Sequence, residues 1–425
     1  MQHQLTKDQI KAFLHYGYVP RPIPLDPADL LSHYGIKIKA IKSQESEKYL
    51  VSKGAEILDN VFMSIACQIG NKTAVIPISG GMDSRAILGG MIRHLSNEQI
   101  QTVTFGIPGA LDYEIGQKVA HKAGVSNKVV NLDYITWDED ELIRYAAKFQ
   151  YPIALVEGFL FSQVFDGFEG NPYFLSGFMG DPLAGSHLPA NQSTDWQQAK
   201  AAFIKRNNYT RREALFSKKN ILPPNPLADT EILTLDEQLD FFIRQRCYIK
   251  PLVLLKGHQH IAPYLNRPWI EFMLNLPQEL RRGQFLYKKI LQYMYPDLFS
   301  LPLKNLGGLP LGASRLQIFE KRVLNKFQKL GRRYLPFVFT RPSPGLNYID
   351  FERAYRENPD LKTIAEKSLD DLNNRNIVEE INIPAIWQEH QSRKYNYAQL
   401  ITLLASLEIF FKAAETKTND YHQQV

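Results

Sequence analysis

Residues 74–85 of the chain read AVIPISGGMDSR, and this stretch carries more information about the architecture than any other. Its first part, the apolar run 74–78, has the length and composition of a buried β-strand. From Arg85 to Leu95, apolar side chains recur at helical spacing. A strand, a glycine-rich turn and a helix start bring consecutive backbone N–H groups to the positive end of the helix dipole. The stretch therefore predicts an anion-binding site of the kind that holds phosphate.

The side chains of this turn suit a nucleotide phosphate and its metal ion. Gly80 and Gly81 let the backbone approach a phosphate closely, and Ser79 and Ser84 add hydroxyl donors. Asp83 supplies the hard oxygen ligand that Mg²⁺ prefers. The alternative is a tight strand-to-helix turn without a ligand. Two glycines flanked by Ser and by Asp-Ser are more than such a turn requires, so we expect an anion-binding site.

Strands and helices alternate around this turn. The pattern predicts strands at 73–78, 101–105, 128–132 and 172–175, with helices at 84–95, 113–123, 138–148 and 157–167 between them. This alternation predicts an α/β fold with a doubly wound, mostly parallel sheet. The phosphate turn would then lie at the carboxyl edge of the sheet, where such folds bind ligands. After about residue 189 the predicted elements are helices, at 194–206, 233–256, 267–275, 284–295, 314–331, 350–356 and 395–415.

We expect four segments along the chain. Residues 1–45 form an N-terminal helix and a proline-rich connector, with a capping box at Thr6 and Gln9 and a C-terminal cap at Gly17. Residues 46–188 form the α/β core, which begins with a long helix capped by Ser46. Residues 189–415 form a mostly helical part that completes the same functional unit. Residues 416–425 form a polar tail.

The composition is that of an ordinary globular protein, with 44% apolar and 22% charged residues among 425. No apolar run approaches the roughly 18–20 residues of a membrane span. The N-terminus lacks the layout of a signal peptide, so we expect a cytoplasmic protein. The two cysteines, Cys67 and Cys247, cannot form a disulfide framework or a structural zinc site. Cys67 lies on an apolar helix face, where we expect it to be a core residue.

The net charge of +6 is modest, and much of the basic excess falls between Arg315 and Arg341. Basic and apolar residues alternate there at helical spacing, which predicts a basic amphipathic helix. Such a helix packs with a solvated basic face, or it lies on a membrane surface or an anionic partner. We therefore keep a peripheral membrane contact through residues 314–333 open. No nucleic-acid-binding module is recognisable, and we expect no nucleic-acid partner.

The motif Ser-Gly-Gly-Met-Asp-Ser at 79–84 resembles the pyrophosphate loop, SGGxDS, of the N-type ATP pyrophosphatases. This group includes the asparagine, NAD, GMP and argininosuccinate synthetases. The motif differs from the Walker loop, which needs G-x-x-x-x-G-K-[ST]. The resemblance implies an ATP pyrophosphatase fold and ATP with Mg²⁺ as cofactors, and it implies that ATP is split to AMP and pyrophosphate.

The next predicted strand ends in Thr102-Val103-Thr104-Phe105-Gly106 and is followed by an acidic helix start with Asp112 and Glu114. This arrangement resembles the asparagine synthetase family, in which the corresponding strand end holds the adenine through backbone groups. The resemblance implies that Val103 and Phe105 contact the nucleotide. For Asp112 and Glu114 a direct ligand role and plain stabilisation of the helix dipole remain equally open.

The segment Phe174 to Pro182 resembles the family's S-G-E-G-x-D-E loop. The resemblance implies that Ser176 and Gly177 line the nucleotide and that Asp181 binds Mg²⁺ together with Asp83. Two positions depart from the family pattern. Phe178 stands where the family has the glutamate that acts on the attacking amine, and Pro182 replaces the last glutamate.

A third match begins at Pro263-Tyr264-Leu265-Asn266 and runs through Leu276-Pro277 and the lysine pair at 288–289 to Lys304, following the family's P-F-L-D…LP…K-x-x-L…P…K progression. The resemblance implies that a lysine reaches the phosphates and stabilises the adenylation transition state. Lys288 fits that position, and Lys289 is one residue out of register. Lys304 matches the second lysine, so Lys288 and Lys304 are the predicted catalytic residues.

Asparagine synthetases carry an N-terminal glutaminase domain whose nucleophile is a cysteine at position 2. Here residue 2 is glutamine, and only about 70 residues precede the phosphate loop. We therefore expect nitrogen from free ammonia, from a separate amidotransferase subunit, or from an amine on the substrate, as in β-lactam synthetase and the lasso-peptide cyclases. The loss of the family glutamate at Phe178 points to an altered acceptor step, because an aromatic ring cannot take a proton.

Together these features predict an ATP-dependent carbon–nitrogen ligase. A small-molecule, peptide or sugar carboxylate would be activated as an acyl-adenylate and passed to ammonia or an amine, with surface-polysaccharide or natural-product biosynthesis as the leading context. Three alternatives remain: an ammonia-dependent asparagine synthetase, a catalytically degenerate ATP-binding subunit, and a tRNA-modifying ATP pyrophosphatase. Two cysteines 180 positions apart argue against a thiolating version of the last.

Overall fold

A five-stranded, all-parallel sheet forms the centre of the protein, which is described by a computed structural model. The structure describes residues 5–20, 45–210, 221–231, 233–314, 316–321, 323–324, 327 and 346–423, with side chains up to residue 416. The sheet order is β3-β2-β1-β4-β5. The strands are β1 (Ala74–Pro77), β2 (Ile100–Gly106), β3 (Ser126–Asn131), β4 (Tyr173–Leu175) and β5 (Gln259–Ile261). The predicted α/β fold with a parallel, doubly wound sheet is confirmed.

Strand β1 occupies the middle of the sheet, so the turn that follows it lies between the ends of the neighbouring strands β2 and β4. Ala74 pairs with Ile100 of β2 on one side and with Tyr173 of β4 on the other. The chain first winds from β1 outward through β2 and β3, and then returns to the other side of β1. The point between β1 and β4 is thus a switch in winding direction, where a crevice forms at the carboxyl ends of the strands.

Helices cover both faces of the sheet, and each face has its own apolar core. Along β1 the side chains alternate, so that Val75 faces one core while Ala74 and Ile76 face the other. On the Val75 side lie α1 (Lys7–Tyr16), α5 (Glu139–Ala146), α6 (Leu155–Asp166), α8 (Trp196–Arg206), α10 (Lys250–Val253), α16 (Phe351–Glu357), α17 (Pro359–Arg375), α18 (Ile383–Gln391) and α19 (Ala398–Gln423). On the other side lie α2 (Glu47–Ile69), α3 (Asp83–His94), α4 (Leu111–Ala123), α11 (Arg267–Asn275), α13 (Phe285–Met294) and α14 (Pro296–Phe299).

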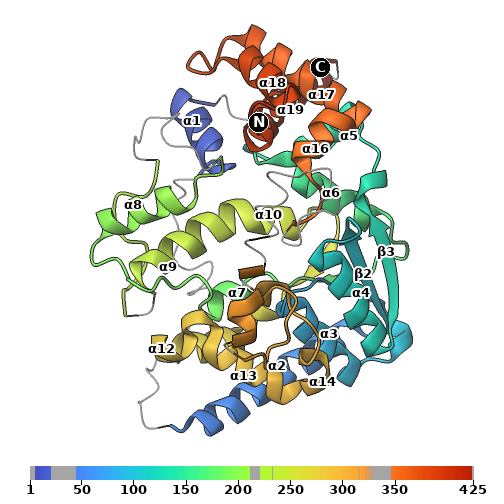
Figure 1. Ribbon diagram of the computed structural model, residues 1–425, viewed down its shortest axis with the longest axis vertical. Coiled ribbons are helices and arrows are strands. Elements are labelled where there is room, and N and C mark those ends of the chain that lie inside the picture. The colour runs from blue at the N-terminus through green and yellow to red at the C-terminus, as the bar shows by residue number, and fades with distance from the viewer. Residues whose placement is uncertain are drawn as a thin grey trace.

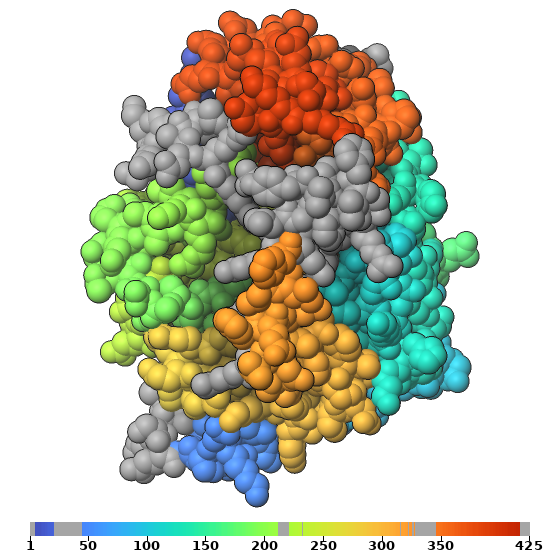
Figure 2. All heavy atoms as spheres, in the orientation of Figure 1, coloured from blue at the N-terminus to red at the C-terminus, as the bar shows by residue number. Residues whose placement is uncertain are grey.

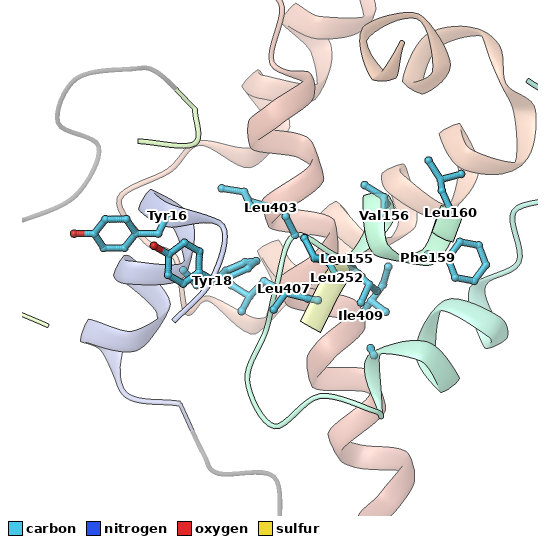
Figure 3. Packing of buried hydrophobic residues seen from close by; sticks show 14 of the residues in the cluster. Tyr16, Tyr18, Leu155, Val156, Phe159, Leu160, Leu252, Leu403, Leu407 and Ile409 are labelled. Atoms are coloured by element: carbon cyan, nitrogen blue, oxygen red, sulfur yellow. The ribbon is translucent and has the colours of Figure 1, made fainter. Parts of the chain in front are cut away.

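The C-terminal helices belong to the same core as the N-terminal helix. Figure 1 shows α17, α18 and α19 together at one end of the molecule and α2, α13 and α14 at the other. Figure 3 shows Leu403 and Leu407 of α19 packed beside Tyr18, which follows α1, and beside Leu155 at the start of α6. Burial of these side chains ties the two ends of the chain to the sheet.

Short elements connect the layers. They are the α-helical turns α7 (Gly180–Leu183), α9 (Leu235–Leu239) and α12 (Gln278–Arg281), and the 3₁₀ turns η2 (Asn97–Gln99), η3 (Leu132–Tyr134), η5 (Pro263–Leu265), η6 (Arg282–Gln284) and η7 (Lys304–Leu306). One further element, η4 (Asp240–Ile249), is a π-helix that joins α9 to α10.

The predicted helix caps are present. Thr6 and Gln9 form the expected capping box, and Gly17 ends α1 with φ 81°, in the left-handed region that glycine tolerates. The Ser46 hydroxyl accepts a hydrogen bond from Tyr49 N at the start of α2.

The structure differs from the predicted elements in three places. Strand β5 was not predicted, because Gln259, His260 and Ile261 show no apolar run. The single helix predicted over 233–256 is divided into α9, η4 and α10 by the change to π geometry. Helices α17 and α18 were also missed; each begins with an asparagine cap before its first turn, at Asn358 and Asn382.

The boundary predicted at residue 188 does not separate the sheet from the helical part, since β5 comes from residues 259–261 and pairs with β4. The prediction that Cys67 is a core residue is wrong, because its side chain is exposed. Residues of α2 such as Val61, Phe62 and Ile65 point inward, and Cys67 lies on the other side of the helix.

Much of the predicted basic helix at 314–331 and of the connector within 1–45 lies outside the described residues. The predicted polar tail does not begin at residue 416, because α19 continues as a helix to Gln423. The described positions within 316–327 are helical, and Leu316, Phe319 and Phe327 are each more than half exposed, at 66%, 64% and 68%. Within the described part of the chain, no helix has the length and apolarity to cross a membrane.

Candidate functional site

A cavity of about 460 Å³ lies at the carboxyl edge of the sheet. The ends of β1, β2 and β4 reach it, as do the π-helix η4 and the turn η7. Most of the predicted nucleotide and metal residues line it: Ser79, Gly81, Asp83, Ser84, Phe105, Ser176, Gly177, Asp181 and Lys304. Gly80, Val103 and Lys288 are not part of its wall. The topology thus brings together residues that are more than 200 positions apart in the sequence.

The phosphate turn follows β1 directly and leads into α3. The Ser79 and Ser84 hydroxyls lie 3.3 Å apart, and Gly81 N donates to the Ser79 hydroxyl at 3.2 Å. No side chain caps the N-terminus of α3. The N–H groups of its first turn and two hydroxyls are therefore available to an anion at the positive end of the helix dipole.

Glycines allow the loop after β4 to approach Asp83. A Cβ at Gly180 would lie 2.5 Å from Asp83 Cγ, and a Cβ at Gly177 would lie 2.9 Å from Asp83 Cβ. Any larger residue at either position would push the carboxylate away. These two glycines are needed for close packing around Asp83.

Asp83 and Asp181 are direct neighbours although 98 positions separate them in the chain. Asp181 N donates to Asp83 Oδ2 at 3.1 Å. Burial raises the pKa of Asp83 well above its usual range, and the negative charge of Asp181 raises it further. Two adjacent carboxylates in a partly enclosed site favour a divalent cation, which would offset their repulsion.

Two buried tyrosines hold Asp83 from the other side. The Tyr287 hydroxyl lies 2.9 Å from Asp83 Oδ1 and 2.8 Å from the Tyr264 hydroxyl, which donates to Asp83 O at 3.0 Å. The Tyr287 hydroxyl donates to the Asp83 carboxylate, which acts on the pKa of Asp83 in the direction opposite to burial, the larger effect.

These carboxyls predict that Mg²⁺ and nucleotide binding release a proton. A metal ligand must be ionised, so binding of Mg²⁺ with a non-hydrolysable ATP analogue should displace the Asp83 proton. Because the pKa of Asp83 is raised, affinity should increase as pH rises toward that pKa and then level off. Titration calorimetry in buffers of different ionisation enthalpy measures the release. Equal apparent enthalpies in all buffers at every pH tested would contradict the prediction.

The residues present fit a magnesium ion bound together with ATP. Mg²⁺ commonly takes one or two protein carboxylates and fills its remaining positions with water and phosphate oxygens. Asp83 and Asp181 provide the two carboxylates, and Gln284 Nε2 fixes Asp181 by donating to Oδ1 at 2.5 Å. Among the described residues no cluster of three or more His, Cys, Asp or Glu forms a self-sufficient metal site. A metal here would therefore depend on the nucleotide.

Lys304 lies directly beside the phosphate turn. Its backbone N–H donates to Gly80 O at 2.9 Å, and its ammonium group donates to Asp112 and Asn347. Asp112 Oδ1 in turn accepts from Gly80 N at 3.0 Å. The orange segment that follows α14 and carries Lys304 is visible on the surface in Figure 2, between α8 in green and α4 in cyan. Asp112 thus links the backbone of the phosphate turn to the ammonium group of Lys304.

Glu114 has a local role. Its carboxylate accepts a hydrogen bond from Gly109 N at 2.8 Å and closes the turn between β2 and α4. Of the two acids at the start of this helix, only Asp112 lines the cavity. The structure therefore distinguishes Asp112, which lines the cavity, from Glu114, which does not, although the sequence pattern left their roles equally open.

Lys288 lies at the periphery of the site. Its ammonium group donates to Gly283 O at 2.8 Å. Burial lowers its pKa, and the charge of Asp181 acts in the opposite direction. Lys289 instead pairs with Glu47 at 2.5 Å and points away from the cavity. Of the adjacent pair, Lys288 is the one within electrostatic reach of the carboxylates.

The end of β2 contributes one of its two predicted nucleotide residues to the cavity. Phe105 lines the wall, with Phe161 at a centroid distance of 5.1 Å and Tyr348 stacked at 6.0 Å. The side chain of Val103 is fully buried in the core, and its carbonyl accepts from Ile78 N at 2.9 Å. An apolar, aromatic wall of this kind suits a planar base.

Several site residues escaped the sequence pattern. Tyr264, Tyr287 and Gln284 hold the two carboxylates from elements far along the chain. Two of the residues near the carboxylates have positive φ without being glycine, Met179 at 69° and Gln284 at 62°. Such conformations concentrate at binding sites, because surrounding contacts must compensate for them. A local sequence pattern shows neither a positive φ at a residue other than glycine nor a contact between distant elements. The sequence therefore did not indicate a role in the site for these residues.

Comparison with known proteins adds no assignment. No protein-family model matches the chain, and no curated protein matches it.

Proposed function

We propose that the chain is an ATP-dependent, AMP-forming carbon–nitrogen ligase of asparagine synthetase type. The observation that supports this best is the contact between Asp83 and Asp181 beside the SGGMDS turn. An SGGxDS turn without a second carboxylate would suit phosphate alone. The pair, placed between the ends of β1 and β4, suits the metal-bound triphosphate of ATP.

The first chemical step is adenylation of a carboxylate. A carboxylate oxygen of the substrate attacks the α-phosphorus of ATP, a P–O bond forms to the acyl group, and pyrophosphate leaves with the bonding electrons. Mg²⁺ held by Asp83 and Asp181 would neutralise phosphate charge. The N–H groups of the phosphate turn and the ammonium of Lys304, which lie beside one another at the cavity, would stabilise the charge that develops on the leaving pyrophosphate.

The second step is attack of a nitrogen nucleophile on the acyl-adenylate, which gives an amide and AMP. Glutamine hydrolysis would need a nucleophile at the site, and neither cysteine lines the cavity: Cys67 is exposed on α2 and Cys247 is buried in η4. This supports ammonia, an amine on the substrate, or ammonia from a separate subunit as the nitrogen source. The carboxylate belongs to a small molecule, a peptide or a sugar acid.

Carboxylate-dependent exchange of labelled pyrophosphate into ATP tests the proposal. A panel of amino acids, dicarboxylates, uronic acids and peptides should contain at least one acid that supports Mg²⁺-dependent exchange. Exchange with aspartate, followed by ammonium-dependent asparagine formation, would identify an asparagine synthetase. Binding of Mg²⁺·ATP without exchange for every acid would instead favour a non-catalytic ATP-binding subunit, which the substitutions Phe178 and Pro182 would explain.

The nitrogen source gives a second prediction. With the acid identified by exchange, amide formation should proceed with ammonium or an amine and should not proceed with glutamine as the only nitrogen donor. Free ammonia is a minor species at neutral pH, so an ammonia-dependent rate should rise as pH increases. Chromatographic detection of amide and of glutamate distinguishes the sources. Glutamate release by the purified chain would contradict the prediction.

Lys288 gives a third prediction. If its ammonium contacts the pyrophosphate only as the transition state forms, Lys288→Ala should lower kcat for exchange more than it raises KM for ATP. Lys289→Ala is the matched control, because that lysine pairs with Glu47 on the outside. Equal kinetics for the two variants would leave Lys304 as the lysine that acts on the phosphates.

A further inference from the structure

The side chain of Phe178 cannot supply the proton acceptor that the proposed reaction needs. It is buried, with 6% exposure, and lines the cavity between Gly177 and Asp181. A neutral nitrogen that attacks an acyl-adenylate must lose a proton as the amide forms, and a benzyl side chain cannot accept it. Another group facing the same cavity has to take this proton if the proposed function holds.

His187 faces that cavity from the segment between α7 and α8. Its Nδ1 lies 2.7 Å from Asp240 Oδ2, and the imidazole is 34% exposed. An ionised carboxylate only accepts hydrogen bonds, so Nδ1 carries the hydrogen and donates it to Asp240. This tautomer leaves the lone pair on Nε2, the nitrogen that a general base uses.

The surroundings of Asp240 hold its carboxylate in the position that contacts His187. The residue is 7% exposed at the first position of the π-helix η4. Gln245 Nε2 lies 3.4 Å from each of its carboxylate oxygens, and Arg244 Nη1 lies 3.7 Å from Oδ1. Residues five apart share a face in a π-helix, which places Gln245 next to Asp240. Both neighbours contact the carboxylate and hold it toward His187.

The surroundings of His187 contain charges of both signs. Asp240 lies behind His187 and is not part of the cavity wall. Besides His187, the charged or titratable groups of the wall are Asp83, Asp112, Asp181, Arg244, His260, Lys304 and Tyr348. Burial lowers the pKa of His260 to about 4, so that ring is neutral, and both of its nitrogens are buried. His187 is therefore the accessible imidazole of the cavity, with one nitrogen oriented by a carboxylate.

We propose that His187 is the general base of the amide-forming step and that Asp240 is its positioning residue, an assignment that rests on the proposed function. As the nitrogen–carbon bond forms, Nε2 of His187 takes a proton from the attacking amine. The carbon–oxygen bond to AMP breaks, and AMP leaves with the electron pair. The imidazolium then returns its proton to solvent, while Asp240 stabilises its charge and does not itself become protonated.

The test separates the two half-reactions in the purified full chain. The carboxylate is the one that supports pyrophosphate exchange, and ammonium is the nucleophile. His187→Gln should keep the exchange rate within about threefold, while single-turnover amide formation falls by about 10²-fold or more. Imidazole added to His187→Ala should restore part of the amide rate, which a purely structural role would not allow. Hydroxylamine, a stronger nucleophile at neutral pH, should still trap the acyl-adenylate in both variants.

Two further variants complete the design. Asp240→Asn should slow amide formation and spare exchange, because an amide can present the wrong hydrogen-bonding group to Nδ1. His94→Gln is the matched control: His94 Nε2 also lies within reach of a carboxylate, 3.2 Å from Asp59, but His94 is not part of the cavity wall. It should leave both half-reactions unchanged. Thermal unfolding of each variant verifies that it is folded.

The outcomes distinguish the two levels of inference. Wild-type amide formation in His187→Gln, with exchange intact, would overturn the assignment of His187 and leave the proposed function standing. Equal loss of exchange and amide formation in folded His187→Gln would also overturn it, because the imidazole would then act before the nitrogen enters. Absence of exchange with every carboxylate in the wild-type protein would overturn the proposed function and this assignment with it.

Discussion

Replacing Asp83 with asparagine is expected to lower carboxylate-dependent pyrophosphate exchange by about 10²-fold or more, a loss typical for removal of a key electrostatic group. Asparagine has nearly the shape of aspartate, so it should preserve the packing against Gly177 and Gly180. It lacks the charge that would hold Mg²⁺ together with Asp181. The exchange assay at saturating Mg²⁺ measures the effect directly.

The control for this variant is Asp59→Asn. Asp59 also interacts with two basic side chains, Arg93 at 3.2 Å and His94 at 3.2 Å, but it lies on the outside of α2. Its replacement should leave exchange unchanged. Full exchange activity in Asp83→Asn at the same Mg²⁺ concentration would show that Asp83 is not a metal ligand in catalysis, and the proposed site would have to be abandoned.

Lys304→Ala is expected to lower exchange by about 10²–10³-fold, because a positive charge aimed at the leaving pyrophosphate contributes most in a site from which water is excluded. The position of Lys304 beside Gly80 and its partner Asp112 supports this role. The decrease should appear in kcat, since the charge on pyrophosphate grows in the transition state. Steady-state exchange at varied ATP concentration separates kcat from KM.

Loss of Lys304 also leaves Asp112 without its cation, and that negative charge alone would repel the phosphates. The double variant Lys304→Ala, Asp112→Asn distinguishes the two causes. If the ammonium acts on pyrophosphate, the double variant should stay as slow as the single one. Recovery of exchange to near the wild-type rate would instead assign the lysine to neutralisation of Asp112.

Local features of the sequence predicted the elements that create the site. The strand at 73–78, the turn at 79–82 and the helix at 84–95 were all found within two residues of their observed bounds. Their signals are short-range: an apolar run, glycines and helical periodicity act between near neighbours in the chain. Strand β5 was not predicted, because its three residues, two of them polar, show no such short-range signal. They form a strand only by pairing with β4.

The location of the candidate site residues was predictable where one motif contains them. Ser79, Asp83 and Ser84 belong to a single turn, so their spacing was sufficient to predict that they lie together. Asp181 was suggested by the family resemblance of the segment that follows another strand, and the ends of parallel strands meet at one edge of the sheet. The contact between Asp83 and Asp181 then depends on β1 and β4 being neighbours.

The sheet order β3-β2-β1-β4-β5, by contrast, emerges only when all strands pair at once. That order places Asp181 against Asp83, directs Lys304 to the phosphate turn and leaves Lys288 at the rim. The contact of His187 with Asp240 arises in the same way, across 53 positions and with help from a π-helix. The local helices, strands and turns follow from interactions between residues that are close in the chain. Contacts across the chain follow from packing of both apolar cores, which no local pattern encodes.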